Sequence, residues 1–400
     1  MIQYTLWLLM LLSTSTLTSS KISCSSKEKC PYNLPCCSPY GECGTGTQCI
    51  NRCNPMFSFH PDSCIAQPIL LFPYHIKFPQ PQTFNCEIAP NYSYFEMDPI
   101  LNHNRFIHFD QFLISPNATV AKQQLLQYDF MYSGHTFLDP ISQEISLRMP
   151  PRTKGSLITT TKQFLYGKCQ VNLKAAKAQG VITAIVLISS VGDEIDFELL
   201  GNEVTTVQSN YFHLGNLDYT KMKLLSTGTD NTLDWHTYEI DWNEDRINWL
   251  VDGKVLRTVN KVETWDPIKK RYIYPQTPVR LEIAIWPGGD IDLPSGTAEW
   301  AGGFIDWDKD PELVKKGYFE ATVKSILVQP YVNSHKSSIV DCIKKNTMRT
   351  KVGIPDLNKV TVSYSSNSNS DFTEKCLVWN CNKIYYLSDN DSSNIQSVVV

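Results

Sequence analysis

The chain has 400 residues, a length that suits two or three structural units, and its 13 cysteines are unevenly placed. Its 36 basic and 40 acidic side chains give a formal net charge of −4, which argues against non-specific nucleic-acid binding because that needs a basic surface. No apolar run of about 18 residues follows the first 20 positions, so no transmembrane helix is predicted.

Residues 1–20 are interpreted as a secretory signal peptide, with an apolar centre at 6–12 and a small, polar end near Ser20. The stretch has no Lys or Arg before that centre, and the alternative, a membrane anchor, would need a longer apolar core. The chain ends in NIQSVVV, without the hydrophobic tail of about 10–20 residues that a GPI signal requires. We therefore expect a secreted protein with no membrane anchor. Three N-glycosylation sequons fit this compartment: Asn91, Asn117 and Asn390.

Eight of the cysteines lie between Cys24 and Cys64, which predicts a small disulfide-rich module over residues 21–64. Two of them are adjacent, which fits disulfides better than zinc, whose ligands favour longer gaps. A unit of about 40 residues cannot be stabilised by apolar burial alone, so bridges would supply much of its stability. The frame that we expect to be bridged is Cys24, Cys30, Cys36, Cys37, Cys43 and Cys49. If all eight pair internally, one of the later five stays free or bonds another chain: Cys86, Cys169, Cys342, Cys376 and Cys381.

The segment CCSPYGECG, residues 36–44, resembles the hevein-type chitin-binding module. In that family a serine hydrogen-bonds the N-acetyl group and aromatic rings stack on sugar faces. The resemblance therefore implies these two roles for Ser38 and Tyr40. Glu42 stands where the family often has a second aromatic residue, which implies weak sugar binding. The alternative is a small disulfide-bonded cap without a ligand.

Residues 65–105 are rich in proline and aromatic residues and are interpreted as a connector or as the first irregular strands of the next domain. Residues 106–335 contain short runs with alternating apolar side chains between turn residues. The clearest runs are 181–188, 194–200, 237–242, 247–251 and 280–286. Asp252-Gly253 predicts a tight hairpin turn, and 173–177 is the clearest short helix. Many strands without interleaved helices predict an all-β fold, a β-sandwich or jelly roll, followed by a polar tail over 336–400.

Within this domain, Glu194, Asp196 and Glu198 alternate along one predicted strand and therefore share one face. Three neighbouring carboxylates repel one another, which is a poor choice for stability alone. They suit a retaining glycosidic mechanism, in which two carboxyls about 5–5.5 Å apart act as nucleophile and as general acid. The alternatives are a solvated acidic edge strand and a calcium site.

The sequence EIDFE at residues 194–198 matches the short E-x-D-x-E motif of glycoside hydrolase family 16, and similarity extends over about 230 residues. IWPGG at 285–289 and TAEWAGG at 297–303 resemble the fungal Crh transglycosylases, which join chitin to β-glucan. The resemblance implies a β-jelly-roll catalytic domain over 106–335. It implies three roles: Glu194 as the nucleophile, Glu198 as the general acid and base, and Asp196 as the residue that orients the nucleophile.

Further residues are candidates for binding sugar. Arg280, Glu282 and Trp286 alternate on one strand face, which indicates the wall of a cleft. Trp286 and Trp300 are candidate sugar platforms, with core packing as the alternative. Glu282 and Thr297 are candidate hydrogen-bond partners. The neighbouring strand contributes three more candidates: Gln208, Asn210 and Tyr211.

The resemblance implies a secreted cell-wall enzyme that cleaves a chitin donor and transfers the chain to a β-glucan acceptor. The missing anchor signal makes the chain most similar to the freely secreted branch of the group, which is associated with the spore wall. The eight histidines show no metal-ligand spacing, and no metal or cofactor is expected. Two alternatives remain: a retaining β-glucan hydrolase on the same scaffold, and a non-catalytic chitin-binding wall protein.

Overall fold

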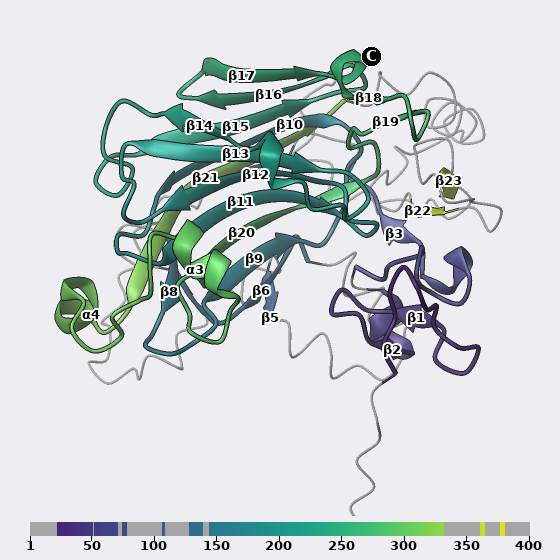
Figure 1. Cartoon of the computed structure of the whole chain (residues 1–400), viewed down its shortest axis with the longest axis horizontal. Helices are drawn as coiled ribbons and strands as arrows, with labels where there is room; N and C mark the ends of the chain where they lie inside the picture. Colours follow the sequence, from purple (N-terminus) through teal and green to yellow (C-terminus); the bar gives the residue numbers. More distant parts are fainter. Residues whose placement is uncertain are drawn as a thin grey trace, which may run out of the picture.

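Two β-sheets face each other and enclose the main hydrophobic core (Figure 1). The computed structural model describes residues 22–50, 52–70, 74–77, 106–108, 128–138, 144–331, 361–364 and 377–380. The expected signal peptide and the end of the chain lie outside these residues. So do the three sequons and four of the later cysteines: Asn91, Asn117, Asn390, Cys86, Cys342, Cys376 and Cys381.

The strands of each sheet are given in spatial order. The first sheet contains β17 (Lys254–Asn260), β16 (Arg246–Val251), β15 (His236–Trp242), β10 (Gly167–Lys174), β21 (Phe319–Pro330), β8 (Ile145–Met149) and β7 (His135–Leu138), with β4 (Tyr74–Lys77) paired to β21. The second sheet contains β14 (Lys223–Ser226), β13 (Thr206–Phe212), β12 (Glu194–Leu200), β11 (Val181–Ser189), β20 (Val279–Pro287), β9 (Ser156–Thr160), β6 (Phe130–Ser133) and β5 (Phe106–His108). The described pairings within the two sheets are antiparallel, except that β5 runs parallel to β6.

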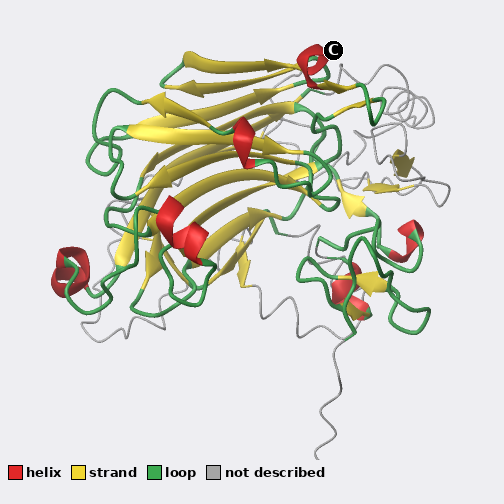
Figure 2. Ribbon diagram, viewed as in Figure 1, coloured by secondary structure: helices red, strands yellow, loops and turns green. Residues whose placement is uncertain are grey.

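The remaining elements are short and lie around the sandwich (Figure 2). Small paired strands are β1 (Cys36–Cys37) with β2 (Cys43–Gly44), β18 (Trp265–Asp266) with β19 (Arg271–Tyr272), and β3 (Gln67–Pro68) with β22 (Thr361–Tyr364), which also pairs with β23 (Leu377–Asn380). Helical turns are η1 (Gly46–Cys49), η2 (Pro61–Ser63), η4 (Tyr219–Lys221), η5 (Lys261–Thr264), α3 (Ser295–Trp300) and α4 (Pro311–Lys316). No helix within the described residues is long and apolar enough to cross a membrane.

The predicted all-β sandwich is confirmed, because period-2 alternation puts every second side chain into the space between the sheets. β12 spans the predicted 194–200, and β11, β15, β16 and β20 agree with the other predicted runs to within one residue at each end. The Asp252-Gly253 turn is also confirmed. Both residues have positive φ, 50° and 77°, and they join β16 to β17 through the Val251–Lys254 pair.

The helix predicted at 173–177 is wrong. Leu173 and Lys174 are the last residues of β10, where Leu173 pairs with His236 on one side and Val323 on the other. Ala176 is fully buried, and its backbone N–H donates to Thr183 Oγ1 at 3.0 Å. Strand pairing on both sides therefore outweighs the helix propensity of this alanine- and lysine-rich stretch.

Large aromatic side chains fill the centre of the sandwich. Trp242 and Trp249 are fully buried, and Trp242 packs edge-on against Tyr166 with ring centroids 4.7 Å apart. Each buried indole N–H has a partner: Trp242 Nε1 donates to Pro275 O at 3.1 Å and Trp249 Nε1 to Asp196 O at 2.9 Å. Since Trp249 lies on the first sheet and Asp196 on the second, this bond ties the two sheets together at β12.

The N-terminal module is cross-linked by four disulfides: Cys24–Cys37, Cys30–Cys43, Cys36–Cys49 and Cys53–Cys64. All eight early cysteines therefore pair within the module, as considered above. Cys169 is a free thiol, fully buried on β10. Burial raises the pKa of this thiol far above its usual value, with Glu239 adding to the shift, so Cys169 is unreactive.

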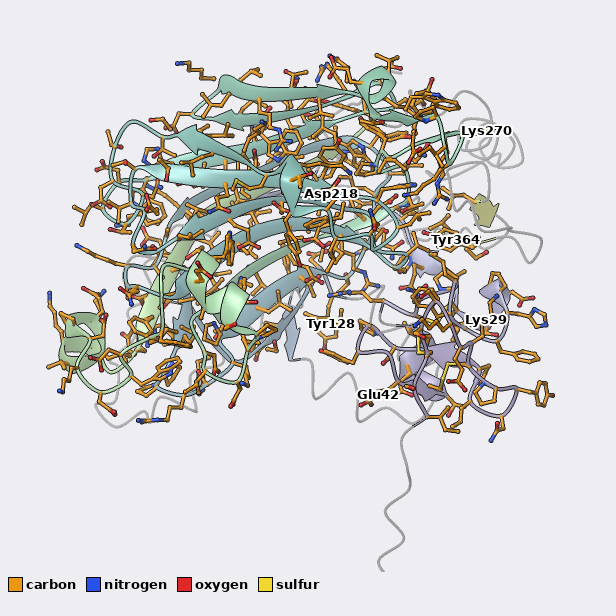
Figure 3. The ribbon with its side chains drawn as sticks, viewed as in Figure 1. Lys29, Glu42, Tyr128, Asp218, Lys270 and Tyr364 are labelled. Atoms are coloured by element: carbon orange, nitrogen blue, oxygen red, sulfur yellow. A yellow bond between two sulfur atoms is a disulfide. The ribbon has the colours of Figure 1, made fainter. Side chains whose placement is uncertain are left out.

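The module lies against the sandwich and the β22–β23 hairpin. Met56 of the module packs with Val191 and Leu214 of the sandwich and with Tyr364 of the hairpin. Figure 3 shows Tyr364 between the two parts. After the module, Leu70 N donates to Gln163 O at 2.7 Å and Gln163 N to Pro68 O at 2.9 Å.

The domain boundaries that we expect from the sequence, at residues 21–64, 65–105, 106–335 and 336–400, stay predictions.

Candidate active site

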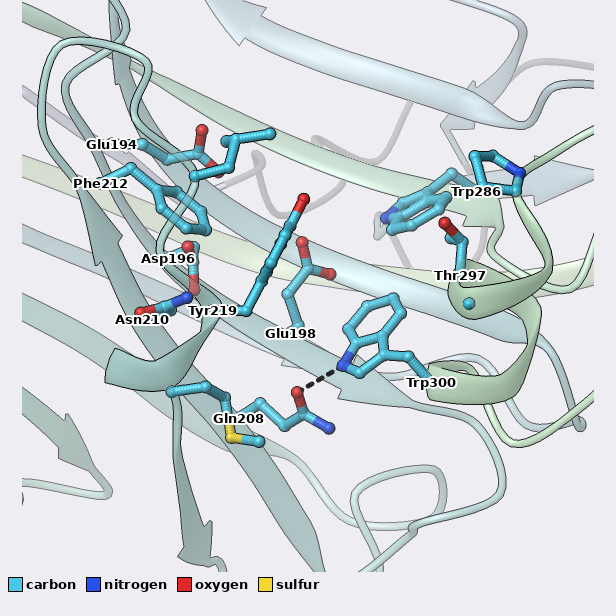
Figure 4. Close-up of a pocket in the computed structure, with 14 residues that line it drawn as sticks. Glu194, Asp196, Glu198, Gln208, Asn210, Phe212, Tyr219, Trp286, Thr297 and Trp300 are labelled. Carbon is cyan, nitrogen blue, oxygen red and sulfur yellow. Dashed lines mark hydrogen bonds between the residues drawn. The ribbon is translucent and has the colours of Figure 1, made fainter.

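Glu194, Asp196 and Glu198 lie in a row on the face of β12 that points away from the sandwich core. Strand alternation produces this row, because the intervening side chains enter the core. These buried alternates are Ile195, Phe197 and Leu199. The carboxylates form the floor of a cleft of about 750 Å³ (Figure 4). Their cross-strand partners on β13 also line it: Phe212 opposite Glu194, Asn210 opposite Asp196, and Gln208 opposite Glu198.

Two indoles form one wall of the cleft (Figure 4). Trp286, from β20, and Trp300, from α3, are stacked with ring centroids 5.8 Å apart and an interplanar angle of 19°. Trp300 Nε1 donates to Gln208 Oε1 at 2.7 Å, which fixes this ring beside the carboxylate row. Thr297, one turn before Trp300, lines the same wall. Both alternatives for the tryptophans hold in part, since the rings line the cleft and also pack on Ile182, Leu200 and Ala301.

The segment between β13 and β14 forms another part of the rim. Leu217, Tyr219 and Met222 from this segment line the cleft, and Tyr219 is 69% exposed. These residues were not predicted from the sequence, because a loop carries no periodic pattern that would show where its side chains point. An aromatic residue in the loop that follows the strand next to the carboxylate strand is the signal that could have identified Tyr219.

The cleft places all three carboxyl groups in an environment that opposes their ionisation. Burial raises the pKa of Glu194 to about 8, and repulsion from Asp196 adds to the shift, while the charge of Arg52 opposes it. Burial raises the pKa of Asp196 to about 7, against a backbone hydrogen bond from Asn210 and the charge of Arg257. The protons of such a cluster are shared, so near neutral pH it holds at least one of them.

Glu198 is the carboxyl best suited to hold that proton. Burial raises its pKa well above the usual value, and Asp196 and Glu194 both add to the shift, with only an indole hydrogen bond from Trp286 opposing it. Positive charges act instead on the other two carboxyls, Arg52 on Glu194 and Arg257 on Asp196. Within the described part of the chain, Glu198 Oε2 and Asp196 Oδ1 are buried without a hydrogen-bond partner. These oxygens are available to a ligand in the cleft.

Asp193 fixes the start of the carboxylate strand. It is fully buried, and each carboxylate oxygen accepts two hydrogen bonds. Oδ1 accepts from Leu214 N at 2.9 Å and lies 2.9 Å from His213 Nδ1; Oδ2 accepts from Gln276 N at 2.8 Å and Thr277 Oγ1 at 2.7 Å. Since Asp193 directly precedes Glu194, this network holds the first carboxyl of the row. This network was not predicted from the sequence, because the partners of Asp193 lie far along the chain.

Three of the predicted sugar-binding residues are not among those that line the cleft. Arg280 is fully buried, and its Nη2 donates to Gln67 Oε1 at 2.6 Å. Tyr211 points into the sandwich beside Trp249, because it alternates with Asn210, which faces the cleft. Glu282 is bound by the guanidinium of Arg52. The structure brings five of the predicted sugar-binding residues together with the carboxylates: Gln208, Asn210, Trp286, Thr297 and Trp300.

On the module, the two residues chosen from the sequence have different surroundings. Ser38 is buried, and its Oγ accepts from the backbone N–H of Glu42 at 3.2 Å. Tyr40 is 80% exposed, which leaves its ring accessible to a sugar. The sulfurs of Cys24, Cys30 and Cys43 lie within 4.8 Å of one another, but each belongs to a disulfide and offers no thiolate to a metal.

Residues 125–302 match the family described as glycosyl hydrolases family 16. The chain is 44% identical over 379 residues to the probable glycosidase CRR1 of Saccharomyces cerevisiae, covering 90% of each chain. It is 36% identical over 319 residues to the Crh-like protein UTR2 of Candida albicans, covering 80% of this chain and 61% of that one. The structure is similar to that of an apo Crh5 transglycosylase, with a TM-score of 0.50 at 27% identity, covering 67% of this chain and 88% of the other.

Proposed function

Because the chain belongs to glycosyl hydrolase family 16 and to its Crh-like proteins, we propose that it is a retaining transglycosylase that cleaves chitin and transfers the released chain to β-glucan in the cell wall. Membership in this family makes the protein an enzyme that acts on glycosides. The observation that carries the proposal is the row of three carboxylates beside the stacked indoles, with Asp196 buried and Glu194 and Glu198 partly buried. A non-catalytic wall protein has no need of three mutually repelling acids that are largely removed from water.

In the first step, the Glu194 carboxylate attacks the anomeric carbon of the donor sugar and forms a covalent ester. The glycosidic C–O bond breaks, and the leaving oxygen takes the proton of Glu198. The electrostatics support these roles, because the positive charge of Arg52 favours the ionised form of Glu194 while Glu198 has two like-charged neighbours. Asp196, between the two, raises the pKa of both, but Arg52 opposes the shift only at Glu194, so Glu198 is the residue that keeps the proton.

In the second step, a sugar hydroxyl of the acceptor attacks the same carbon. Glu198, now ionised, takes the hydroxyl proton, and the bond between Glu194 and the sugar breaks to restore the free carboxylate. Two displacements on one carbon retain its configuration. Water performs the same step in a hydrolase, so the choice between the two reactions depends on what occupies the acceptor side of the cleft.

The lining of the cleft favours a sugar over water. Trp286, Trp300, Tyr219 and Leu217 present rings and an alkyl group around the carboxylates. Pyranose rings stack on such surfaces, whereas isolated water molecules gain little from them. A stacked acceptor is also held in position for attack, which raises its effective concentration relative to water.

A two-substrate assay tests the proposal. The protein is incubated with chito-oligosaccharide donors and a fluorescent β-glucan oligosaccharide, beside the Glu194→Gln variant. We expect labelled products longer than the acceptor from the wild type and none from the variant. Reducing ends without longer labelled products would show a hydrolase, and inactivity of both proteins on all donors would favour a non-catalytic wall protein.

We further propose that the disulfide-rich module binds chitin through Tyr40 and Ser38. The exposed ring of Tyr40 supports this proposal. Tyr32 is a matched control, because it lies on the same module and is 81% exposed. Tyr40→Ala should reduce retention on insoluble chitin, whereas Tyr32→Ala should not; equal retention of both variants would contradict the assignment.

The spore-wall location stays a prediction from the sequence. It is tested by locating a tagged full-length protein in vegetative and in sporulating cells. Signal confined to the spore wall would support the location, and signal in the vegetative wall would contradict it.

A further inference from the structure

The disulfide-rich module reaches the face of the second sheet that carries the carboxylates. Arg52, on the module, donates from Nη1 to both carboxylate oxygens of Glu282 on β20, at 2.9 and 3.2 Å. The two side chains are 27% and 12% exposed, so the ion pair is largely shielded from solvent. A shielded, two-oxygen contact of this kind is stronger and better oriented than a surface ion pair.

Strand register places this ion pair next to the carboxylate row. Glu282 pairs with Val186 on β11, and Val186 pairs with Asp196 on β12. Directly opposite residues of antiparallel strands point to the same face, so Glu282 lies on the cleft face, two strands from Asp196. By the same reasoning Arg280 lies in the row of Glu194, with Ile188 between them.

Two disulfides and a left-handed backbone conformation constrain the module around Arg52. Arg52 lies between Cys49 and Cys53, which form disulfides with Cys36 and Cys64. Its φ is 51°, in the left-handed region that few residues other than glycine adopt. Such a conformation is kept only where the surrounding structure determines it. The backbone from which the guanidinium reaches β20 is therefore constrained on both sides.

Two further contacts fix the module at this end of the cleft. Met56 packs with Val191, in the turn that leads into β12. Gln67, just after the module, accepts a hydrogen bond from Arg280, which is fully buried. The module and the segment that follows it thus close over the Arg280 and Glu282 end of the carboxylate face.

We propose that Arg52 is a positioning residue of the active site: it binds Glu282 and places a fixed positive charge beside the nucleophile Glu194. The disulfide-rich module is then a structural part of the catalytic machinery as well as a chitin-binding candidate. This inference rests on the proposed function, because it takes Glu194 as the nucleophile.

The charges around Glu194 give Arg52 its effect. The charged groups that face it are Asp196 and Glu198 on β12, Glu282 and Arg280 on β20, and Arg52 on the module; β13 and η4 contribute the uncharged Asn210, Phe212 and Tyr219. Arg52 lowers the pKa of Glu194, whereas Asp196 and Glu282 raise it. Without Arg52, the carboxyl would keep its proton to higher pH and would be a weaker nucleophile there.

The test uses the whole chain with glutamate labelled at the carboxyl carbon with ¹³C, and Glu194 assigned by the signal lost in Glu194→Gln. Arg52→Met removes the charge but keeps the volume, and Arg52→Lys restores the charge. Glu282→Gln removes the neighbouring anion. Arg152→Met is the matched control, because Arg152 makes the same two-oxygen contact with Asp308, at 2.9 and 3.1 Å, on an exposed part of the surface.

We expect the titration midpoint of Glu194 to rise by about one pH unit in Arg52→Met, less in Arg52→Lys, and to fall in Glu282→Gln. The acid limb of the pH profile of kcat/KM should move in the same directions. Arg152→Met should move neither. Opposite signs for Arg52→Met and Glu282→Gln exclude a mere loss of structure, which would affect both variants alike.

An unchanged midpoint in Arg52→Met, or a shift of equal sign in Glu282→Gln, would overturn the role of Arg52. If Arg52→Met does not fold, the titration midpoints of Glu194 in Arg52→Lys and Glu282→Gln decide the role of Arg52. The midpoint should rise in the first variant and fall in the second. A wild-type protein without any glycosidic activity would overturn the proposed function, while the titration still decides on Arg52.

Discussion

Trp286 and Trp300 are stacked 5.8 Å apart, although one ring extends from a sheet strand and the other from a short helix that follows it by several residues. The near-parallel planes make one continuous apolar surface. Gln208 accepts a hydrogen bond from the indole N–H of Trp300, the outer of the two rings. This bond fixes the surface relative to β13 and to the carboxylate row. We propose that this surface is a preformed platform for a sugar ring.

Removal of the outer ring tests this platform. Trp300→Ala should raise the KM for the β-glucan acceptor by about tenfold, equivalent to about 1.4 kcal/mol, with a smaller effect on hydrolysis. Acceptor kinetics with a fluorescent oligosaccharide measure this. Trp265→Ala is the control, because Trp265 is 47% exposed and does not line the cleft. An unchanged acceptor KM in Trp300→Ala would show that the Trp300 ring contributes to packing and does not bind the acceptor.

The proposed acid role of Glu198 predicts a dependence on the leaving group. Glu198→Gln should slow cleavage of chito-oligosaccharides by about 10²–10⁴-fold, because the leaving oxygen is no longer protonated. A nitrophenyl leaving group needs no proton, so its release should be far less affected. Added azide should then accept the sugar with retained configuration. Equal losses on both donors would assign the acid role elsewhere.

The buried carboxyl of Glu194 predicts how stability changes with pH. Its folded-state pKa, about 8, is above its usual value, so between these two values the folded protein binds more protons than the unfolded chain. Stability is therefore fully present below the unfolded pKa and falls as pH rises toward 8, by up to about 1.4 kcal/mol per pH unit.

Glu194→Gln mimics the protonated carboxyl and should remove this contribution. Urea unfolding at pH 5 and pH 8 measures the effect. We expect the variant to be more stable than the wild type at pH 8 and similar to it at pH 5. A variant less stable than the wild type at pH 8 would show that the ionised carboxyl is well stabilised in the fold.

The Asp193 network predicts a structural effect next to the site. Asp193→Asn places an N–H group against donors from Gln276 and Thr277 or from Leu214, and should destabilise the fold by about 2–3 kcal/mol. Thermal unfolding measures this. The control is Asp308→Asn on the exposed Arg152 pair, which should change stability by less than about 0.5 kcal/mol. Similar values for both would mean that the buried network contributes little.

The sequence allowed prediction of features that depend on local alternation. The carboxylate row on β12 and the core strands follow from a period of two, and the short motif was sufficient to find Glu194 and Glu198. Alternation also shows that only one of Asn210 and Tyr211 can face the cleft. Which of them does so is known only once the strand pairing is known, because the pairing with Asp196 puts Asn210 in the cleft.

Other parts of the site depend on contacts that sequence patterns do not encode. Tyr219 lies on a loop, and Asp193 is bound by residues more than 80 positions later. Arg52 meets Glu282 across 230 positions, and it is presented by a disulfide-bonded module that has its own sequence pattern. Such long-range placement is fixed by the packing of whole elements, so it becomes visible only in the folded structure.

The most direct test of the central claim is to trap the covalent intermediate. Glu198→Gln is incubated with a chito-oligosaccharyl fluoride, whose leaving group needs no acid, and the intact protein and its peptides are weighed by mass spectrometry. We predict one added oligosaccharide on the peptide at Glu194, which persists with β-glucan oligosaccharide because this variant lacks the general base, and which is lost when azide is added. An adduct on another residue, or none in Glu198→Gln while the wild type turns over the same donor, would contradict the assignment of Glu194 as the nucleophile.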